Sequence, residues 1–302
     1  MADLKVNIAG VEWNNPVTTG SGTFGFGEEY GEYFDLSKLG AVCLKALSVV
    51  PRKGNPSPRI AEGNMGILNS VGLQNPGIAY FKEHYLPNLR KYDTKLIANI
   101  CGSTEDDYVN AAIELGDCVD MLELNISCPN VKNGGMAFGT SSAATESITK
   151  KVKSVAKAPL IVKLSPNVTD ICEIARAAES GGADAVSLIN TLLGMRIDIK
   201  TRRPVLKNNT GGLSGPAVMP IAVRMVSQVY HAVKIPIIGM GGISSGDDAI
   251  EFFLAGASAV SVGTAGFVNP YAWLDVIDGI NDYLDANNIK SINDIVGKAE
   301  LY

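Results

Sequence analysis

The sequence predicts a (β/α)8, or TIM, barrel, and three observations support this fold class. Eight short apolar runs with the length of buried strands alternate along the chain with helical patterns. No Gly-x-Gly-x-x-Gly motif opens the first expected helix, over residues 105–116, which disfavours the alternative, a doubly wound open sheet. The length of 302 residues leaves room for a barrel with long loops. We therefore expect a single domain over residues 1–302, with parallel strands and right-handed crossovers.

Each expected strand is a short apolar run that ends near polar residues or glycines. The eight runs are residues 16–20, 41–46, 95–101, 119–125, 159–165, 184–190, 235–239 and 258–263. The main helical patterns are residues 105–116, 143–157, 169–180, 216–233, 247–255 and 269–288. The helix over 105–116 follows a capping signal at Ser103-Thr-Glu, and the helix over 169–180 ends at a glycine pair.

Two connections are much longer than a usual loop between a strand and a helix. Residues 47–76 are rich in proline and glycine, and residues 191–215 contain three arginines and a glycine pair. Both segments leave the C-terminal ends of strands. We therefore expect both insertions to lie over the C-terminal mouth of the barrel, where barrels of this kind carry their functional residues.

The composition disfavours several classes of protein. Hydrophobic residues make up 46% and charged residues 19%, which indicates a large core. The net charge of −5, without a basic cluster, disfavours a nucleic-acid partner. The five cysteines form no Cys-x-x-Cys pair and the two histidines are far apart, so we expect no disulfide, zinc or iron–sulfur site. We expect a cytoplasmic protein, because neither a signal peptide nor a membrane span is apparent.

Polar residues crowd the end of the strand expected at 119–125. They include Asn125, Ser127, Cys128 and Asn130, and glycines follow them. The other four cysteines lie in apolar strands or helices, whereas Cys128 stands in a polar loop. A cysteine in such a loop can serve as a nucleophile, a redox thiol or a general base. General base is at least as well supported as nucleophile, because no histidine is close in sequence.

Two lysines are expected inside the barrel near its mouth, because strand alternation turns Lys45 and Lys163 inward. A buried ammonium needs a partner, and Glu123 could supply it as a structural ion pair. The two lysines together with the strand-end asparagines favour instead a bound polar or anionic ring; these are Asn99, Asn125 and Asn190. A Schiff-base lyase that uses Lys163 is an alternative from another class, but it leaves Cys128 and the glycine loops unexplained.

Glycine-rich loops follow the last two expected strands. Their sequences are Gly239-Met-Gly-Gly-Ile-Ser and Ser261-Val-Gly-Thr. In such barrels these two loops form the phosphate site, because glycine lets main-chain N–H groups approach an anion. Ordinary tight turns are the simpler interpretation of one such loop, but two at these strands favour a phosphorylated cofactor across the mouth. A non-catalytic barrel that binds a phosphorylated ligand is a further alternative.

Four motifs occur together in this chain. They are Asn125-Ile-Ser-Cys-Pro-Asn-Val with Lys163-Leu-Ser-Pro-Asn, Asn69-Ser-Val-Gly-Leu-Gln-Asn-Pro, Asn190-Thr, and Gly239-Met-Gly-Gly. In this combination the whole chain resembles the dihydroorotate dehydrogenase family. Cys128-Pro-Asn-Val-Lys-Asn-Gly-Gly and Ser21-Gly-Thr-Phe-Gly-Phe-Gly-Glu-Glu-Tyr resemble class 1B, the NAD-linked catalytic subunit. The membrane class differs, with a serine base and an N-terminal membrane extension.

The resemblance implies oxidation of (S)-dihydroorotate to orotate in de novo pyrimidine (UMP) biosynthesis, with FMN as cofactor and no metal. It implies that Cys128 is the general base that removes the C5 proton, while a hydride passes from C6 to the flavin. The implied cofactor-binding residues are Ser21, Lys45, Ala46, Asn99, Asn125, Lys163, Ile189, Gly215, Gly241, Gly242, Gly263 and Thr264. The implied substrate-binding residues are Lys45, Asn69, Ser70, Val71, Gly72, Leu73, Asn125, Asn130, Asn190 and Thr191.

The resemblance also implies a partner, an electron-transfer subunit with FAD and a [2Fe–2S] cluster that passes electrons to NAD+. The expected assembly is a heterotetramer of two catalytic and two electron-transfer subunits. This chain has neither clustered cysteines nor a dinucleotide fingerprint, which fits that division of labour. The stand-alone class 1A enzymes, which use fumarate, also lack both features and are the alternative within the same chemistry.

Overall fold

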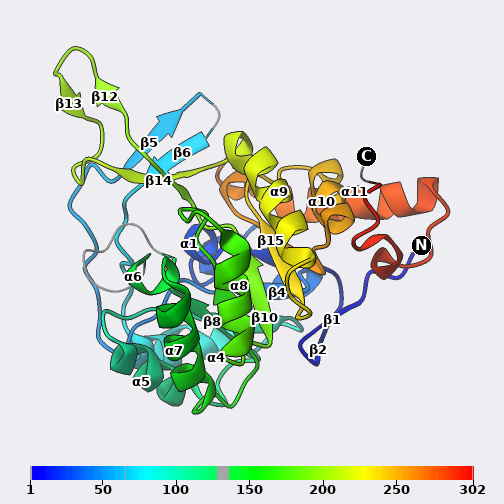
Figure 1. The fold of residues 1–302 in the computed structure, drawn as a ribbon, viewed down its shortest axis with the longest axis horizontal. Helices are drawn as coiled ribbons and strands as arrows, with labels where there is room; N and C mark the ends of the chain where they lie inside the picture. Colours follow the sequence, from blue (N-terminus) through cyan, green and yellow to red (C-terminus); the bar gives the residue numbers. More distant parts are fainter. Residues whose placement is uncertain (1, 65, 128–135, 301) are drawn as a thin grey trace.

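Eight parallel strands form the centre of the protein in a computed structural model that describes residues 2–64, 66–127, 136–300 and 302 (Figure 1). The strands are β3 (Val17–Thr19), β4 (Ala41–Cys43), β7 (Lys95–Ile100), β8 (Met121–Asn125), β9 (Leu160–Lys163), β10 (Ala185–Leu188), β15 (Ile237–Met240) and β16 (Ala259–Val262). They are hydrogen-bonded in the order β3-β16-β15-β10-β9-β8-β7-β4. This is the strand order of a (β/α)8 barrel, so the predicted fold class is confirmed.

The barrel closes between β3 and β4, the two ends of this order. The N–H of Gly40 donates to the carbonyl of Val17 at 3.1 Å. Farther along, the Thr19 hydroxyl donates to the Cys43 carbonyl at 3.0 Å and accepts from the Cys43 N–H at 2.9 Å. A side chain therefore replaces the main-chain ladder at this point of the ring.

Each predicted strand overlaps an observed strand, but one differs in a way that matters for the site. The run at 41–46 was expected to carry Lys45 within a strand, whereas β4 ends at Cys43. The N–H of Lys45 donates to the carbonyl of Gly25 at 2.8 Å, and the chain pairs with β7 again only at Leu47. Lys45 consequently belongs to the connection at the mouth of the barrel.

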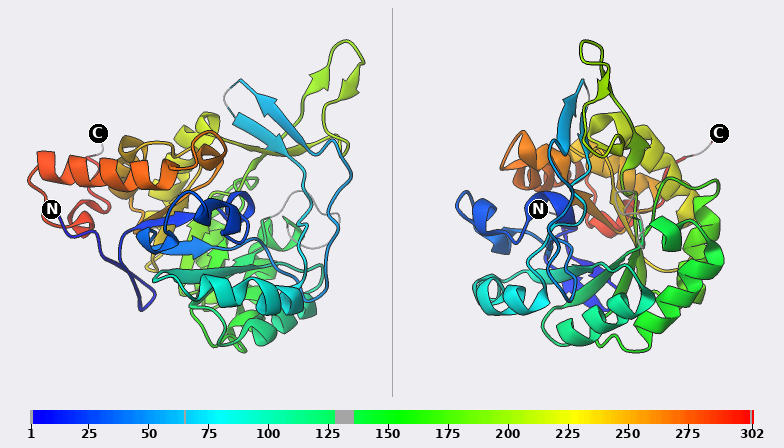
Figure 2. Two further views of the ribbon diagram at one scale, coloured as in Figure 1. Left: turned by 180° about the vertical axis from the view of Figure 1, so that it is seen from behind. Right: turned by 90° about the vertical axis from the view of Figure 1, so that its left-hand side faces the viewer.

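Helices surround the strands (Figure 2). The longer ones are α3 (Ile78–His84), α5 (Glu105–Leu115), α7 (Ser142–Lys153), α8 (Ile171–Ser180), α9 (Met219–Tyr230), α10 (Gly246–Ala255) and α11 (Ala272–Ala286). Helix α5 begins at the predicted cap, where Thr104 and Asp107 form a reciprocal capping box. Each helix turns an apolar face to the barrel, as Ile171, Ile174 and Ala178 of α8 do. No helix in the described residues is long and apolar enough to cross a membrane.

The two long insertions pair with each other. Strands β5 (Ile60–Gly63) and β6 (Gly66–Asn69) come from the first insertion, and β11 (Leu192–Gly194) and β14 (Gly211–Ser214) come from the second. They form one antiparallel sheet in the order β11-β14-β6-β5, here called the roof sheet. The small hairpin β12 (Ile197–Asp198) and β13 (Arg203–Pro204) projects beyond it (Figure 1). The sequence placed these insertions at the mouth but did not predict their pairing.

Several short elements were not predicted either. They are the helix α3, the strands β1 (Val6–Ile8) and β2 (Val11–Trp13), the helices α1 (Ser21–Phe24), α2 (Glu28–Gly31), α4 (Leu86–Leu89) and α6 (Met136–Gly139), and the 3-10 turns η1 (Leu36–Lys38), η2 (Pro216–Val218), η3 (Thr264–Phe267) and η4 (Ile292–Ile295). The helix expected over 216–233 is therefore the 3-10 turn η2 followed by α9. Most of these elements are too short to carry a hydrophobic period.

Candidate active site

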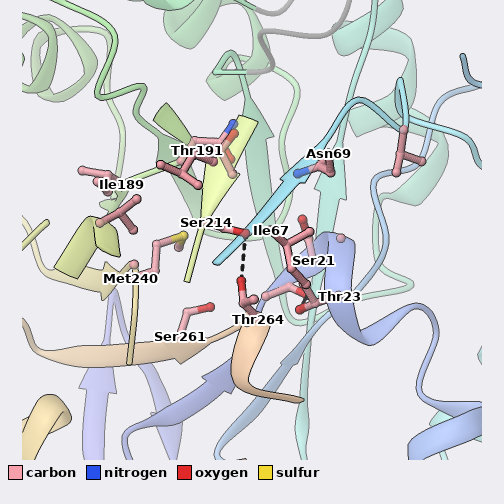
Figure 3. A pocket seen from close by; sticks show the side chains of 18 of the residues that line it. Ser21, Thr23, Ile67, Asn69, Ile189, Thr191, Ser214, Met240, Ser261 and Thr264 are labelled. Atoms are coloured by element: carbon pink, nitrogen blue, oxygen red, sulfur yellow. Dashed lines mark hydrogen bonds between the residues drawn. The ribbon is translucent and has the colours of Figure 1, made fainter. Parts of the chain in front are cut away.

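A cavity of about 220 Å³ lies between the C-terminal ends of the barrel strands and the roof sheet (Figure 3). Barrel strands supply its lower wall, for example through Asn125, Lys163 and Met240. The roof sheet supplies residues from both insertions, including Ile67, Asn69 and Ser214. The roof sheet thus covers the cavity that the strand ends form.

Most of the site residues predicted from the sequence line this one cavity. Those expected to bind the cofactor are Ser21, Lys45, Ala46, Asn125, Lys163, Ile189, Gly241, Gly242, Gly263 and Thr264. Those expected to bind only the substrate are Asn69, Val71, Gly72, Leu73, Asn190 and Thr191. Segments far apart in the sequence therefore meet where the resemblance implies a joint site.

Five predicted residues lie elsewhere or cannot be placed. Gly215 lines an adjoining cavity of about 500 Å³, which shares Gly242 and Thr264 with the first. Asn99 and Ser70 are fully buried and are not among the described residues that line either cavity. Cys128 and Asn130 lie outside the described residues.

Sequence reasoning missed other residues of the cavity wall. They are Gly20, Gly22, Thr23, Ile60, Ile67, Leu213, Ser214, Val218, Met240, Ser261 and Phe267. Met240 and Ser261 stand in the strand-end motifs already singled out, so their position could have revealed them. Ile67 and Ser214 gave no such signal, because they reach the cavity only through the roof sheet. There the Thr264 hydroxyl donates to Ser214 Oγ at 2.9 Å (Figure 3).

Lys163 is the most deeply buried ammonium at the cavity. Lys163 is only 7% exposed. It is the last residue of β9, after three apolar residues, and it lines the cavity. Within the described part of the chain, no hydrogen bond or ion pair at Lys163 is found, so the predicted alternative of an ion pair with Glu123 is not supported. A buried ammonium is stable beside an anionic or electron-rich group. The cavity is the place where a ligand would bring such a group to Lys163.

The Glu123 carboxylate has other partners. Asn99 Nδ2 donates to its Oε2 at 2.5 Å, and the Ser187 hydroxyl donates to its Oε1 at 2.7 Å. The Cys43 thiol also donates to Oε2, at 3.5 Å. Burial, and second the Glu123 charge, raise the pKa of Cys43 well above its ordinary value. Cys43 therefore stays protonated, as expected of a structural cysteine.

The glycine loop after β15 has a main-chain conformation that favours glycine. Gly241 has a φ of +128° and Gly242 a φ of +87°. A Cβ atom on Gly242 would lie 2.7 Å from the Cβ of Met219, at the start of α9. The loop therefore packs directly against this helix while it lines the cavity. Together with Gly263 and Thr264 it forms a wall without bulky side chains, which suits a phosphate group.

The chemistry of the described residues is that of an organic-ligand site. In the described ranges, no group of three or more His, Cys, Asp or Glu side chains is arranged to hold a metal ion. The cavity instead combines amide side chains, hydroxyl groups, lysines and glycines. Such groups bind and orient a polar ring and an attached phosphate.

Comparisons with known proteins agree with this site. The family model described as dihydroorotate dehydrogenase matches residues 3–284. The chain is 62% identical over 296 residues to the dihydroorotate dehydrogenase B (NAD(+)) catalytic subunit of Alkaliphilus metalliredigens, and the match covers 98% of each chain. It is 54% identical over 303 residues to the protein of the same name from Bacteroides fragilis, with 100% of each chain covered.

A solved structure shares the fold. The crystal structure of dihydroorotate dehydrogenase (DHODH) from Eimeria tenella, in complex with ferulenol, matches with a TM-score of 0.82 and 26% sequence identity. The match covers 98% of this chain and 88% of the other. The resemblance read from the sequence motifs is thus confirmed over nearly the whole chain, and this protein belongs to the dihydroorotate dehydrogenase family.

Proposed function

We propose that this chain is the catalytic subunit of an NAD-linked dihydroorotate dehydrogenase, which oxidises (S)-dihydroorotate to orotate in pyrimidine biosynthesis. The observation that carries the proposal is the single cavity in which Lys163, the glycine loops and the strand-end asparagines meet. The relatives named as NAD(+)-linked catalytic subunits support it. The Schiff-base lyase is the alternative that also uses Lys163.

FMN is the cofactor that the described residues fit. The buried Lys163 ammonium, without a partner among the described residues, suits the electron-rich pyrimidine side of a flavin and would favour negative charge there. Gly241, Gly242, Gly263 and Thr264 would hold the phosphate, and Ser21 and Ala46 would line the remaining wall. When bound, FMN supplies the hydride acceptor for the oxidation.

Asparagines would position the substrate. Asn69, Asn125 and Asn190 line the same cavity from three different segments. The side chain of Asn190 is held by Ser127, because its Nδ2 donates to the carbonyl of Ser127 at 2.9 Å. An amide offers both a donor and an acceptor without adding charge, which matches the imide edge of dihydroorotate.

Cys128 is proposed as the general base, although it lies outside the described residues. Cys128 follows Ser127 in the sequence, and the carbonyl of Ser127 accepts a hydrogen bond from Asn190. The Cys128 thiolate would take the proton from C5 of the substrate. A thiol with an ordinary pKa of about 8.5 is mostly protonated at neutral pH, so the loop or the substrate must assist its ionisation.

The Cys128→Ala variant tests this role. We expect it to retain FMN but to lose most flavin reduction by dihydroorotate at neutral pH, measured by stopped-flow absorbance. Removal of a general base costs about 10² to 10⁴ in rate. Wild-type reduction rates in Cys128→Ala would exclude the thiol from the mechanism.

A separate electron-transfer subunit is proposed as the partner. The name of the relatives, catalytic subunit, supports a division of labour between two chains. We propose that the partner carries FAD and a [2Fe–2S] cluster, passes electrons to NAD+, and joins this chain in a heterotetramer in the cytoplasm. Activity with NAD+ only when the partner is present would support this, whereas fumarate reduction by the isolated chain would favour the class 1A alternative.

The overall function is tested by adding dihydroorotate anaerobically to the purified chain. We expect a yellow protein whose oxidised-flavin absorbance disappears as orotate forms. A colourless protein that is inactivated by borohydride in the presence of a carbonyl substrate would instead support the lyase. A yellow protein that dihydroorotate does not bleach would leave only a phosphate-ligand binding barrel.

A further inference from the structure

A chain of hydrogen bonds rises from the buried Glu123 carboxylate to the cavity wall. Glu123 is 3% exposed and lies on β8 two residues before Asn125, so both side chains point to the barrel interior. Asn99 Nδ2 donates to Glu123 Oε2 at 2.5 Å, and Asn125 Nδ2 donates to Asn99 Oδ1 at 3.1 Å. Of these three residues only Asn125 lines the cavity.

The chemistry of Glu123 sets the direction of this chain of bonds. Ser187 and Cys43 donate to the Glu123 carboxylate, and Asn99 likewise turns its NH₂ group to it. The carbonyl oxygen of Asn99 then faces Asn125 and can only accept. Asn125 must therefore turn its own NH₂ group down to Asn99.

The other end of the chain of bonds agrees with this direction. The main-chain N–H of Ser127, which can only donate, lies 3.4 Å from Asn125 Oδ1. The Ser127 hydroxyl donates to the same oxygen at 3.3 Å. Both ends thus require the same orientation of the Asn125 amide, which without such partners could turn by 180° at little cost.

We propose that Glu123 is a positioning residue: through Asn99 it fixes the Asn125 amide so that its second N–H faces the ligand. This inference rests on the proposed function and deepens it. Asn125 then offers a donor to an oxygen of the dihydroorotate ring or of the product orotate. If the amide turned over, two acceptors would face each other, and binding would weaken.

The alternative is that Glu123 acts by its charge or only by filling space, and three variants separate these roles. In Glu123→Gln, the carbonyl oxygen can still accept from Asn99 while the amide N–H donates to the Ser187 hydroxyl, which also accepts. Glu123→Gln thus removes the charge but keeps the direction of the bonds. Glu123→Met has a similar length but removes the acceptor. Asn125→Ala removes the residue through which Glu123 is proposed to act.

The experiment titrates each FMN-loaded variant with orotate and follows the change in the flavin spectrum. We expect the orotate dissociation constant to rise by about tenfold in Glu123→Met, which corresponds to about 1.4 kcal/mol. In Glu123→Gln it should stay within about threefold of wild type. In the Asn125→Ala background, Glu123→Met should cause no further loss, because interacting residues are not additive. FMN content and the melting temperature are measured alongside.

Three results would overturn the inference. An equal loss in Glu123→Gln and Glu123→Met would assign the effect to charge. An additive loss in the double variant would assign it to general disruption of the core, and an unchanged affinity in Glu123→Met would exclude any role. If Glu123→Met does not fold with FMN, Asn99→Leu breaks the same chain of bonds and is compared with Asn125→Ala in the same way.

Measurements on the wild-type protein distinguish a failure of this inference from a failure of the proposed function. If the wild-type protein binds FMN but neither binds orotate nor is reduced by dihydroorotate, the proposed function and this inference both fail. If the wild-type protein binds orotate and only the predicted pattern among the variants is missing, the inference fails alone.

Discussion

The hydroxyl of Thr19 bridges both main-chain groups of Cys43. It donates to the Cys43 carbonyl at 3.0 Å and accepts from the Cys43 N–H at 2.9 Å. Thr19 and Cys43 are the last residues of β3 and β4, the two strands at which the order of the barrel closes. A single hydroxyl therefore satisfies two buried polar groups that the strand ladder does not reach.

The Thr19→Val variant should destabilise the protein, because it removes this hydroxyl while nearly conserving volume. The N–H and carbonyl of Cys43 would both lose their partner, at a cost of about 2 to 4 kcal/mol in the free energy of unfolding. Urea unfolding followed by circular dichroism measures this cost.

Thr18→Val is the matched control for this prediction. Thr18 is the neighbouring residue of β3, and its buried hydroxyl makes no hydrogen bond within the described residues. Removal of an unsatisfied hydroxyl should leave the stability unchanged or raise it. Equal losses in the two variants would show that the Thr19 bridge does not close the barrel.

Lys163→Met should slow flavin reduction, because it keeps the length of the side chain but removes the buried positive charge from the cavity. We expect the rate of reduction by dihydroorotate to fall by about 100-fold, the usual effect of losing one charge-stabilising group. Anaerobic stopped-flow absorbance measures the rate, and the FMN content shows how far cofactor binding also depends on Lys163.

Lys157→Met provides the control for a lost lysine. The Lys157 side chain is 66% exposed and pairs with Asp117 at 3.1 Å on the outer surface. Such surface pairs contribute little, about 0 to 1 kcal/mol, so the reduction rate should not change. A normal rate and normal FMN content in Lys163→Met would refute the assigned role of Lys163.

The barrel could be predicted from the sequence because its strands are buried on both faces. Residues such as those of β9 and β16 form short apolar runs without alternation, which is typical of parallel strands. The roof sheet could not be predicted in this way. Its strands β5 and β11 are partly exposed and contain glycine, and the two strands that join the insertions, β6 and β14, lie more than a hundred residues apart in the sequence.

The same distinction applies to the site. Lys163 and Asn125 stand at the ends of apolar strands, so their place at the mouth followed from the fold class. Ile67 and Ser214 reach the cavity only because two remote insertions pair, which no local pattern records. Asn99 was expected to bind the cofactor; in the structure it is hydrogen-bonded between Glu123 and Asn125, and its cofactor role stays a prediction. The predicted roles of Cys128 and Asn130 stay predictions.

Gly242→Ala should weaken FMN binding. Alanine at this position must adopt a φ of +87° and place its Cβ 2.7 Å from the Cβ of Met219. The loop would have to move away from α9. This movement would displace the wall that is proposed to hold the phosphate. We expect the FMN dissociation constant to rise by about tenfold or more, measured by fluorescence titration of the apoprotein.

Gly10→Ala separates crowding from backbone strain. Gly10 has the same φ of +87°, but a Cβ there would meet no atom within 4 Å. This variant should lose only the cost of the left-handed conformation, about 1 to 2 kcal/mol of stability, and should bind FMN normally. Equal FMN affinity in Gly242→Ala and Gly10→Ala would contradict the proposed phosphate site.

The capping box of α5 should make part of the stability depend on pH. Asp107 Oδ2 accepts from the N–H groups of Ser103 at 2.7 Å and Thr104 at 3.0 Å. Burial raises the pKa of Asp107, but these donors outweigh it and hold the pKa below its ordinary value. A carboxyl with a lowered folded-state pKa stabilises the protein above its unfolded pKa, about 3.9. That contribution is lost as the pH falls through the folded pKa.

Asp107→Asn should therefore destabilise the protein by about 1 kcal/mol at neutral pH, the usual value of a helix cap. The difference from wild type should stay constant between about pH 7 and pH 5, and shrink below about pH 4 as the wild-type carboxyl is protonated. Urea unfolding over a pH series measures it. Asp106→Asn makes the same charge change in the same first turn and serves as the control. A difference between Asp107→Asn and wild type that persists or grows in acid would show that the carboxylate charge is not what stabilises the cap.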